Sequence, residues 1–247
     1  MHDGAGDGRK PPMALVTATR MEMRPALSLL APGLDTPERG VAMATVAGRE
    51  VLLLVTGVGP VNAALELGAV LGRYEISGAL NIGVAGSYDL MRAPLEAAVV
   101  ADAEVCAEYG VTCADGLADV SRFPFAQLRT GDESVSQRMT LDPKAAARAM
   151  GLSLPAGLVT GTGVTVAGIT GCAERADALA SRHGALTESM EGFSLALGCA
   201  SRGLPFLEVR TISNRVGDRD HAQWKLEQAL AGLGALLAGL FSGPGPR

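Results

Sequence analysis

The sequence has few lysines, few aromatic residues and few cysteines, and each shortage excludes a class of protein. Lysine occurs only as Lys10, Lys144 and Lys225, and none of them lies in a GxxxxGK[ST] pattern. A P-loop nucleotidase is therefore excluded. Aromatic residues make up 4% of the chain and the formal net charge is -5. Because nucleic-acid-binding surfaces need basic clusters with interleaved aromatic residues, we expect no nucleic-acid partner.

The cysteines and the apolar runs exclude further classes. Four cysteines are scattered along the chain without a CxxC pair, which argues against a disulfide framework and against a zinc site. No uninterrupted apolar run reaches the roughly 18 residues that a membrane-spanning helix needs. The first residues, MHDGAGDGRKPP, lack the apolar stretch of a secretion signal. We therefore expect no membrane partner and a cytoplasmic location.

The overall composition is that of a compact folded protein. Of the 247 residues, 48% are hydrophobic and 19% are charged, which excludes a disordered chain. The length suits one large domain with a full hydrophobic core. We predict a disordered N-terminal tail over residues 1–12 and a single domain over residues 13–247.

From Met13 onward, short β-type runs alternate with stretches of helical spacing. Strands are expected over residues 13–18, 41–46, 51–56, 79–83, 97–106, 157–161, 185–189 and 205–213. Helices are expected over residues 23–32, 61–74, 171–182, 190–201 and 222–241. Residues 108–140 show weak periodicity and are predicted to form an excursion or lid. The alternation predicts an α/β fold with a central mixed sheet flanked by helices.

Because open α/β sheets bind ligands beyond the carboxyl ends of their strands, the residues that follow strands are candidates for a site. The segment GVGPVN at 57–62 superficially resembles a dinucleotide fingerprint. Asn62 replaces its third glycine and no acidic residue ends the next strand, so a tight strand-to-helix turn is favoured. Glu22 follows the first strand, where a carboxylate can activate a water molecule. A solvated glutamate stabilised by the helix dipole is the alternative.

Two later junctions carry more polar side chains. The segment ESMEG at 188–192 lies between a strand and a helix. A carboxylate there can accept hydrogen bonds from two vicinal sugar hydroxyls, whereas a helix cap with an exposed acid is the alternative. The segment RTISN at 210–214 runs into charged residues at 215–220, more than folding alone requires. Capping of the final helix and surface ion pairs are the alternatives for that cluster.

The order of these motifs resembles the purine nucleoside phosphorylase and nucleosidase superfamily. The shared pattern is a glutamate after the first strand, then GVGPVNAA, GVAGS, ESMEG and RTISN, between about residues 13 and 241. The segments AEYG, GVTV, TESMEG and ISNRVGDRD are most similar to those of the futalosine hydrolases, nucleosidases of the alternative menaquinone pathway. The resemblance implies a nucleoside phosphorylase-like fold and hydrolysis of futalosine with release of hypoxanthine. It also implies no metal or organic cofactor, and a homo-oligomer that is a dimer or larger.

The resemblance implies roles for particular residues. Met190 and Glu191 match the motif whose glutamate holds the ribose hydroxyls, and Glu22 matches the glutamate that positions the attacking water. Asn214 matches the residue that contacts the base. Other residues expected to line the base and the sugar through backbone atoms are Ala85, Gly86, Val164 and Thr165.

Asn214 stands where relatives that cleave 6-aminopurine nucleosides have aspartate. Its amide NH2 can donate to O6 or N7 of a 6-oxopurine, which favours hypoxanthine over adenine as the leaving group. Phosphorolytic relatives carry an arginine on the central strand, whereas that strand ends here at Ile82, so hydrolysis is favoured. Arg20 and Arg24 beside Glu22 leave a 6-oxopurine nucleoside phosphorylase open as an alternative. A purine-nucleoside-binding domain without turnover is the non-enzymatic alternative.

The sequence does not define the substituent at the 5′ position of the substrate. We expect its selection to depend on residues 108–140 and on a neighbouring subunit, as the resemblance implies.

Overall fold

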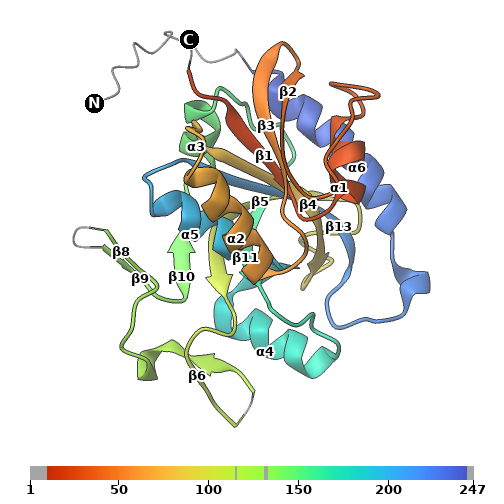
Figure 1. The fold of residues 1–247 in the computed structure, drawn as a ribbon. Helices are drawn as coiled ribbons and strands as arrows, with labels where there is room; N and C mark the ends of the chain where they lie inside the picture. Colours follow the sequence, from red (N-terminus) through yellow and green to blue (C-terminus); the bar gives the residue numbers. More distant parts are fainter. Residues whose placement is uncertain (1–9, 115, 131–132, 244–247) are drawn as a thin grey trace.

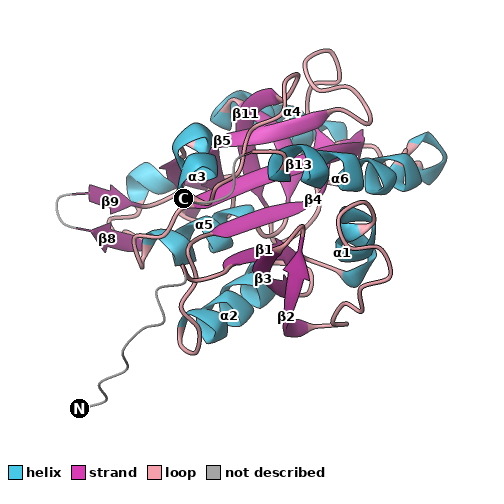
Figure 2. Ribbon diagram, turned by 90° about the horizontal axis from the view of Figure 1, so that it is seen from above, coloured by secondary structure: helices cyan, strands magenta, loops and turns pink. Residues whose placement is uncertain are grey.

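A mixed β-sheet forms the centre of the molecule, and helices cover both of its faces (Figure 1, Figure 2). The computed structural model describes residues 10–114, 116–130 and 133–243. Of the predicted N-terminal tail, residues 1–9 lie outside the described residues, and so do residues 244–247 of the predicted domain. In the described part, the predicted α/β fold with a central mixed sheet flanked by helices is confirmed.

The sheet contains nine of the described strands, in the order β10–β5–β11–β12–β4–β1–β3–β2, with β13 paired to both β4 and β5. These strands are β1 (Met13–Thr17), β2 (Gly40–Val46), β3 (Arg49–Val55), β4 (Ala79–Ser87), β5 (Ala98–Cys106), β10 (Arg138–Thr140), β11 (Val159–Thr165), β12 (Ala185–Ser189) and β13 (Phe206–Arg215). Five of these strands form a closed ring. Starting from β4, each pairs with the next in the order β4–β13–β5–β11–β12, and β12 pairs with β4 again. We call these five strands the five-strand ring.

Helices pack on the two faces of the sheet. They are α1 (Arg20–Leu27), α2 (Pro60–Leu71), α3 (Pro143–Ala149), α4 (Ala173–His183), α5 (Gly192–Ala200) and α6 (Leu226–Phe241), with short 3-10 helices η1 (Val120–Arg122) and η2 (His221–Gln223). Within the described residues, no helix combines the length and the apolar character needed to cross a membrane.

The side chains of β1 show how the two faces are filled. Leu15 packs into a core with α1, α3 and α6, whereas Ala14 and Val16 pack into a second core with α2 and α5. Successive side chains of a strand point to opposite faces, so a central strand with both faces covered is apolar throughout. This explains the uninterrupted apolar run at residues 13–16.

The predicted hairpin at 41–56 is confirmed. β2 and β3 pair antiparallel through a two-residue turn, in which Ala47 has φ 48° and Gly48 has φ 76°. Positive φ at both central positions suits the right-handed twist of a hairpin.

The segment Val84–Ser87 is part of a strand, which corrects the prediction of a loop there. β4 continues to Ser87 because its backbone pairs with both β13 and β12. Gly86 permits this pairing, since a Cβ atom at that position would lie 2.8 Å from Val216 Cγ2 and 3.2 Å from Asn214 Nδ2. Glycine inside a strand is typical of such close approaches.

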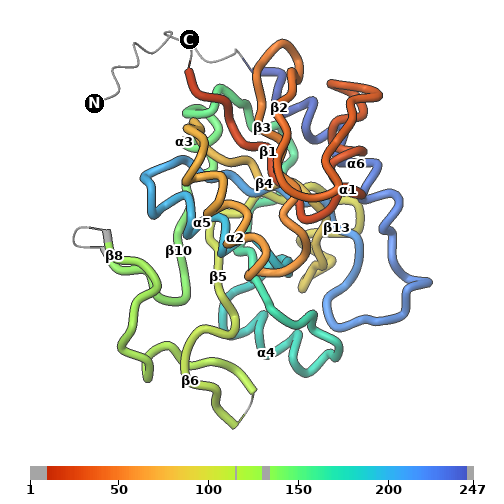
Figure 3. The backbone as a smooth tube through the Cα atoms, viewed as in Figure 1, coloured from red at the N-terminus to blue at the C-terminus, as the bar shows by residue number. Residues whose placement is uncertain are grey.

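Residues 108–140 form an excursion that extends away from the main sheet until β10 rejoins it (Figure 3). The excursion contains two small antiparallel pairs, β6 (Val111–Thr112) with β7 (Ala118–Asp119), and β8 (Leu128–Thr130) with β9 (Glu133–Val135). The helix α3 that follows was not predicted. It begins at Pro143 with Asp142 as its N-cap, whose carboxylate accepts from Ala145 N at 2.9 Å.

Candidate active site

A cavity of about 220 Å³ opens where β1, β4, β12 and β13 end. It lies at the carboxyl ends of β1 and of its neighbours, which is the expected place for a ligand in a sheet of this kind. The structure brings most of the predicted site residues together here. The predicted residues that line the cavity are Glu22, Ala85, Gly86, Met190, Glu191 and Asn214.

Glu22 is buried in the cavity wall, with 5% of its surface exposed, which overturns the alternative of a solvated glutamate. It lies in the first turn of α1, where it forms a capping box with Thr19. Its Oε2 accepts from Thr19 N at 3.0 Å and from Thr19 Oγ1 at 2.9 Å, while its Oε1 accepts from Val84 N at 3.1 Å. Three donors therefore fix the carboxylate against β4.

Glu191 comes to the cavity from the start of α5, and the 57–62 loop fixes it there. Its Oε1 accepts from Gly59 N at 2.9 Å. Gly59 has φ 102°, a conformation that favours glycine, and Pro60 then begins α2. The segment at 57–62 is thus the predicted tight turn, and it also binds a site carboxylate.

The electrostatic surroundings of Glu191 act in opposite directions. Burial raises the pKa of its carboxyl group, and the guanidinium of Arg210 opposes this rise. Arg210 Nη2 lies 3.7 Å from Glu191 Oε2.

Asn214 lies near the end of β13 with its side chain half-buried. Its Oδ1 accepts from Ser213 Oγ at 2.8 Å, and its Nδ2 donates to Arg215 O at 2.9 Å. A side-chain amide has two hydrogens and two acceptor lone pairs, so one of each is left for a ligand.

Val164 and Thr165 are not brought to the cavity, which corrects the prediction that they line it. Both are buried in β11, where Val164 packs in an apolar cluster with Leu179. Thr165 Oγ1 donates to Glu104 Oε2 at 3.0 Å and accepts from Phe193 N at 2.7 Å. Thr165 thus supports the first turn of α5 from within the five-strand ring.

Glu188 lines the cavity, but its hydrogen bonds hold the neighbouring loop. Its Oε1 accepts from Thr170 N at 3.0 Å, and its Oε2 accepts from Thr170 Oγ1 and Tyr88 Oη, both at 2.6 Å. Burial and the Glu188 carboxylate raise the pKa of Tyr88 above its ordinary value. Glu188 is thus a buried anchor for the cavity wall rather than an exposed cap.

The segment after β13 adds a rim to the cavity. Trp224 lines it, and Trp224 Nε1 donates to Asp218 O at 3.2 Å. The guanidinium of Arg219 lies 5.0 Å from the centre of the Trp224 ring. Asp220 caps η2 by accepting from Ala222 N at 3.0 Å, so the interpretation that it caps the final helix is wrong.

The arginines near Glu22 do not reach the cavity. Arg20 is engaged by Thr36, Asp35 and Glu38 on the outer side of α1. Arg24 is absent from the cavity wall as well. Among the described lining residues, the charged side chains are three carboxylates (Glu22, Glu188 and Glu191) and one cation, Arg219.

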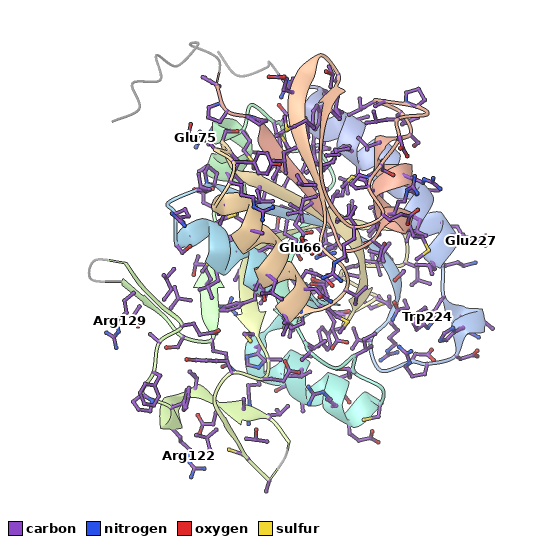
Figure 4. All side chains as sticks on the ribbon, viewed as in Figure 1. Glu66, Glu75, Arg122, Arg129, Trp224 and Glu227 are labelled. Carbon is purple, nitrogen blue, oxygen red and sulfur yellow. The ribbon has the colours of Figure 1, made fainter. Side chains whose placement is uncertain are left out.

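No described residue between 108 and 140 lines this cavity. Figure 4 shows Arg122 and Arg129 of the excursion on one side of the molecule and Trp224 of the cavity rim on the other. The excursion is therefore not a lid over the cavity of its own chain.

Sequence reasoning missed Glu104 and Glu208, which are buried behind the cavity wall. The signal for Glu208 was its spacing from Arg210, because residues two apart in a strand share a face. An acidic and a basic side chain on one face of a predicted buried strand indicate an ion pair, and Arg210 Nε lies 3.0 Å from Glu208 Oε1. In the described part of the chain, no three His, Cys, Asp or Glu side chains are grouped to hold a metal ion.

Comparisons with known proteins agree with this arrangement. Residues 12–241 match the family model described as "Phosphorylase superfamily". A futalosine hydrolase from Streptomyces coelicolor is 35% identical over 231 residues, which cover 90% of this chain and 92% of that protein. A futalosine hydrolase from Thermus thermophilus is 34% identical, with 94% and 96% covered.

Solved structures support the fold. A Helicobacter pylori MTAN mutant with 5′-methylthioadenosine in its active site has a TM-score of 0.72 at 19% identity, covering 93% of this chain and 97% of that one. The native futalosine hydrolase of H. pylori has a TM-score of 0.71 at 19% identity, with 93% and 96% covered.

Proposed function

Because the chain belongs to the phosphorylase superfamily and, within it, to the futalosine hydrolase family, we propose that it hydrolyses the N-glycosidic bond of futalosine and releases hypoxanthine. It is a hydrolase acting on N-glycosyl bonds, as its family is. The proposal includes a place in the alternative, futalosine pathway of menaquinone biosynthesis. The cytoplasmic location stays a prediction.

The observation that carries the proposal is the fixed carboxylate of Glu22 in a cavity poor in cations. In the proposed reaction, Glu22 accepts a proton from a water molecule that attacks C1′ of the ribose. The three donors that hold its two oxygens determine the direction of the remaining lone pairs, so the base is oriented before substrate binds. Bond cleavage passes through a transition state of oxocarbenium character.

Glu191 and Asn214 hold the two ends of the nucleoside in this scheme. Glu191 accepts hydrogen bonds from the 2′- and 3′-hydroxyls, with Gly59 N fixing one of its oxygens. Asn214 donates its free amide hydrogen to O6 or N7 of the departing base, and its position against Gly86 supports this role. Stabilisation of charge that develops on the leaving base lowers the barrier.

The charges of the cavity favour water over phosphate as the nucleophile. The described lining residues include three carboxylates and one rim cation, and Arg210 behind the wall is already paired with Glu208 and Glu191, so a phosphate dianion is disfavoured. Arg20 is held in ion pairs outside the cavity, so it does not compensate for the missing strand arginine. This supports hydrolysis over the alternative of a 6-oxopurine nucleoside phosphorylase.

The experiment is a measurement of hypoxanthine release from futalosine and from inosine, with phosphate removed and then restored. Release from futalosine without phosphate is the expected result. Release only in the presence of phosphate would identify a phosphorylase. No release from either nucleoside, together with binding of one of them, would identify a binding domain without turnover.

We also propose that the chain forms a homo-oligomer, a dimer or larger, in which a neighbouring subunit helps to select the 5′ substituent. Val58, Val61 and Leu65 are apolar side chains on α2 and the loop before it, and they are 51%, 70% and 64% exposed. Val58 also lines the cavity. A contiguous exposed apolar surface beside a binding site is typical of a protein interface.

A further inference from the structure

Behind the cavity wall, the five-strand ring holds a cluster of buried ionisable side chains. Glu104 lies on β5, and Glu208 and Arg210 lie on β13; their exposed fractions are 0%, 1% and 2%. None of the three lines the cavity. Buried charges are costly unless they are paired and hydrogen-bonded, so the hydrogen bonds of this cluster reveal its charge state.

Glu208 is surrounded by donors. Its Oε1 accepts from Arg210 Nε at 3.0 Å, and its Oε2 accepts from Asn81 Nδ2 at 2.6 Å. A cation on one oxygen and an amide on the other stabilise the anionic form of this carboxyl group.

Glu104 has a different environment. Its Oε2 accepts from Thr165 Oγ1 at 3.0 Å, while its Oε1 has no hydrogen-bond partner among the described residues. An anionic carboxylate with a bare oxygen in a fully buried place is strongly disfavoured, whereas a neutral carboxylic acid is tolerated.

The two carboxyl groups converge on one point. A Cβ atom at Gly192 would lie 2.5 Å from Glu208 Oε2 and 2.6 Å from Glu104 Oε2. Two carboxylates this close and out of contact with water do not both ionise, because the second negative charge is repelled by the first. Burial and the charge of Glu208 accordingly raise the pKa of Glu104 well above its ordinary value, although Arg210 and Thr165 oppose the rise.

We propose that Glu104 carries a proton and donates it to Glu208, and that the resulting monoanionic pair positions Arg210 between the two cavity carboxylates, Glu22 and Glu191. The effect of the Arg210 position on turnover rests on the proposed function, whereas the protonation state of Glu104 does not.

The geometry of Arg210 connects the pair to the cavity. Its Nη2 lies 3.7 Å from Glu191 Oε2, and its Nη1 donates to Val84 O at 3.5 Å. A Cβ atom at Gly83 would lie 2.6 Å from Arg210 Nη1 and 2.5 Å from Glu22 Oε1, so the guanidinium and the Glu22 carboxylate lie on either side of this glycine. Glu208 holds the Nε side and thereby directs the two Nη groups toward the site. Glu104 and Glu208 are positioning residues, because they act through Arg210.

The proton determines the charge balance. With Glu104 neutral, the single negative charge on Glu208 balances Arg210. With both carboxyl groups ionised, their two negative charges would exceed the single positive charge of Arg210. The excess negative charge would raise the pKa of Glu191 further, since Glu208 already raises it.

The test compares Glu104→Gln with Glu208→Gln in the full chain. Glutamine at 104 replaces a neutral acid with a neutral amide whose NH2 keeps the donor to Glu208, at the cost of the single hydrogen bond that Thr165 Oγ1 donates to Glu104 Oε2. We expect kcat and KM for futalosine to stay within a few-fold of the wild type. Glutamine at 208 removes the anion that holds Arg210, so we expect kcat to fall about tenfold or more. Because Arg210 would then lose its counter-charge and stabilise ionised Glu191, the acidic limb of the pH–kcat profile should move to lower pH.

Two measurements test the proton without any turnover. Infrared spectroscopy should show a carbonyl band of a buried protonated carboxyl group in the wild type, and this band should be absent from Glu104→Gln. A group whose folded-state pKa is raised stabilises the fold least at high pH. The melting temperature of Glu104→Gln relative to the wild type should therefore increase as pH rises above the ordinary range of glutamate.

The proposal is overturned by an equal loss of kcat in both variants with both correctly folded, by persistence of the infrared band in Glu104→Gln, or by a stability difference that does not change with pH. If Glu208→Gln does not fold, the infrared and stability measurements on Glu104→Gln still decide the protonation state. If futalosine is not a substrate, the same two measurements remain valid, so failure of the proposed function and failure of this inference are distinguishable.

Discussion

The two carboxylate oxygens of Glu22 are bound by different elements, Oε2 by the first turn of α1 and Oε1 by the backbone of β4. The same side chain therefore completes a helix cap and faces the cavity. Its location after the first strand was predictable from the sequence, because strand ends meet at one edge of the sheet. Its burial was not predictable, because burial depends on the approach of Val84 from a strand more than sixty residues later.

Glu22→Gln should separate the role of Glu22 in the helix cap from its role as the proposed base. The amide oxygen can still accept one hydrogen bond, but the group no longer accepts a proton. We expect turnover to fall by about 10² or more, and the free energy of unfolding to fall by about 1 kcal/mol because the amide nitrogen cannot accept the hydrogen bond of the oxygen it replaces. Steady-state kinetics and thermal melting measure the two effects. Glu227→Gln, at an exposed glutamate in the first turn of α6, is the control and should leave turnover unchanged. Near-normal turnover of Glu22→Gln would show that another group is the base.

Asn214→Asp tests which hydrogen bonds residue 214 makes to the purine base. Aspartate has no amide hydrogen to donate to O6 or N7, so the catalytic efficiency on a 6-oxopurine nucleoside should fall about tenfold or more. Activity on adenosine relative to inosine should rise, because a carboxylate can accept from the 6-amino group. The ratio of the two efficiencies is the measurement. An unchanged ratio would contradict the proposed role of Asn214.

At the scale of the element, the sequence predicted those strands and helices whose residues alone determine their structure. The hairpin β2–β3 followed from two β-type runs around a short turn, and β1 followed from its apolar run. The segment Val84–Ser87 was mistaken for a loop, because Gly86 and the preceding Gly83 indicate flexibility in isolation. It is a strand because partners from β12 and β13, far along the chain, pair with it. The helix α3 was missed although Asp142 and Pro143 are a helix-start signal.

The first turn of α5 makes a prediction at Gly192. A methyl group at this position would collide with Glu104 and Glu208, whose carboxyl groups are held by other strands. We expect Gly192→Ala to lower the free energy of unfolding by about 1–3 kcal/mol, the usual cost of overpacking. Gly68→Ala is the control, because Gly68 lies within α2 with open space around it. That control should raise stability by about 0.5–1 kcal/mol. Denaturant unfolding of both variants measures the difference, and equal stabilities would contradict the close approach at Gly192.

At the scale of the whole molecule, the exposed apolar surface on α2 predicts self-association. Val61→Asp places a charge at a side chain that is 70% exposed in the isolated chain. If this surface is an interface, the variant should have a lower molar mass by light scattering than the wild type, and it should lose activity on futalosine more than on inosine. Leu29→Asp, at an exposed position on the other face of the sheet, is the control. A wild-type chain that is monomeric at micromolar concentration would contradict the proposed oligomer.

The closure of the five-strand ring also has a consequence for how the protein is made. β13 lies between β4 and β5, yet among the described strands it leaves the ribosome last. Until residues 206–215 have been synthesised, β4 and β5 each present an unpaired edge, and Glu104 lacks its neighbouring carboxyl group, Glu208. Unpaired edges are templates for aggregation, and pairings between distant segments form slowly. We therefore expect the ring to close only after residues 206–215 have been synthesised, and the open edges of β4 and β5 to make the nascent chain prone to aggregation until then.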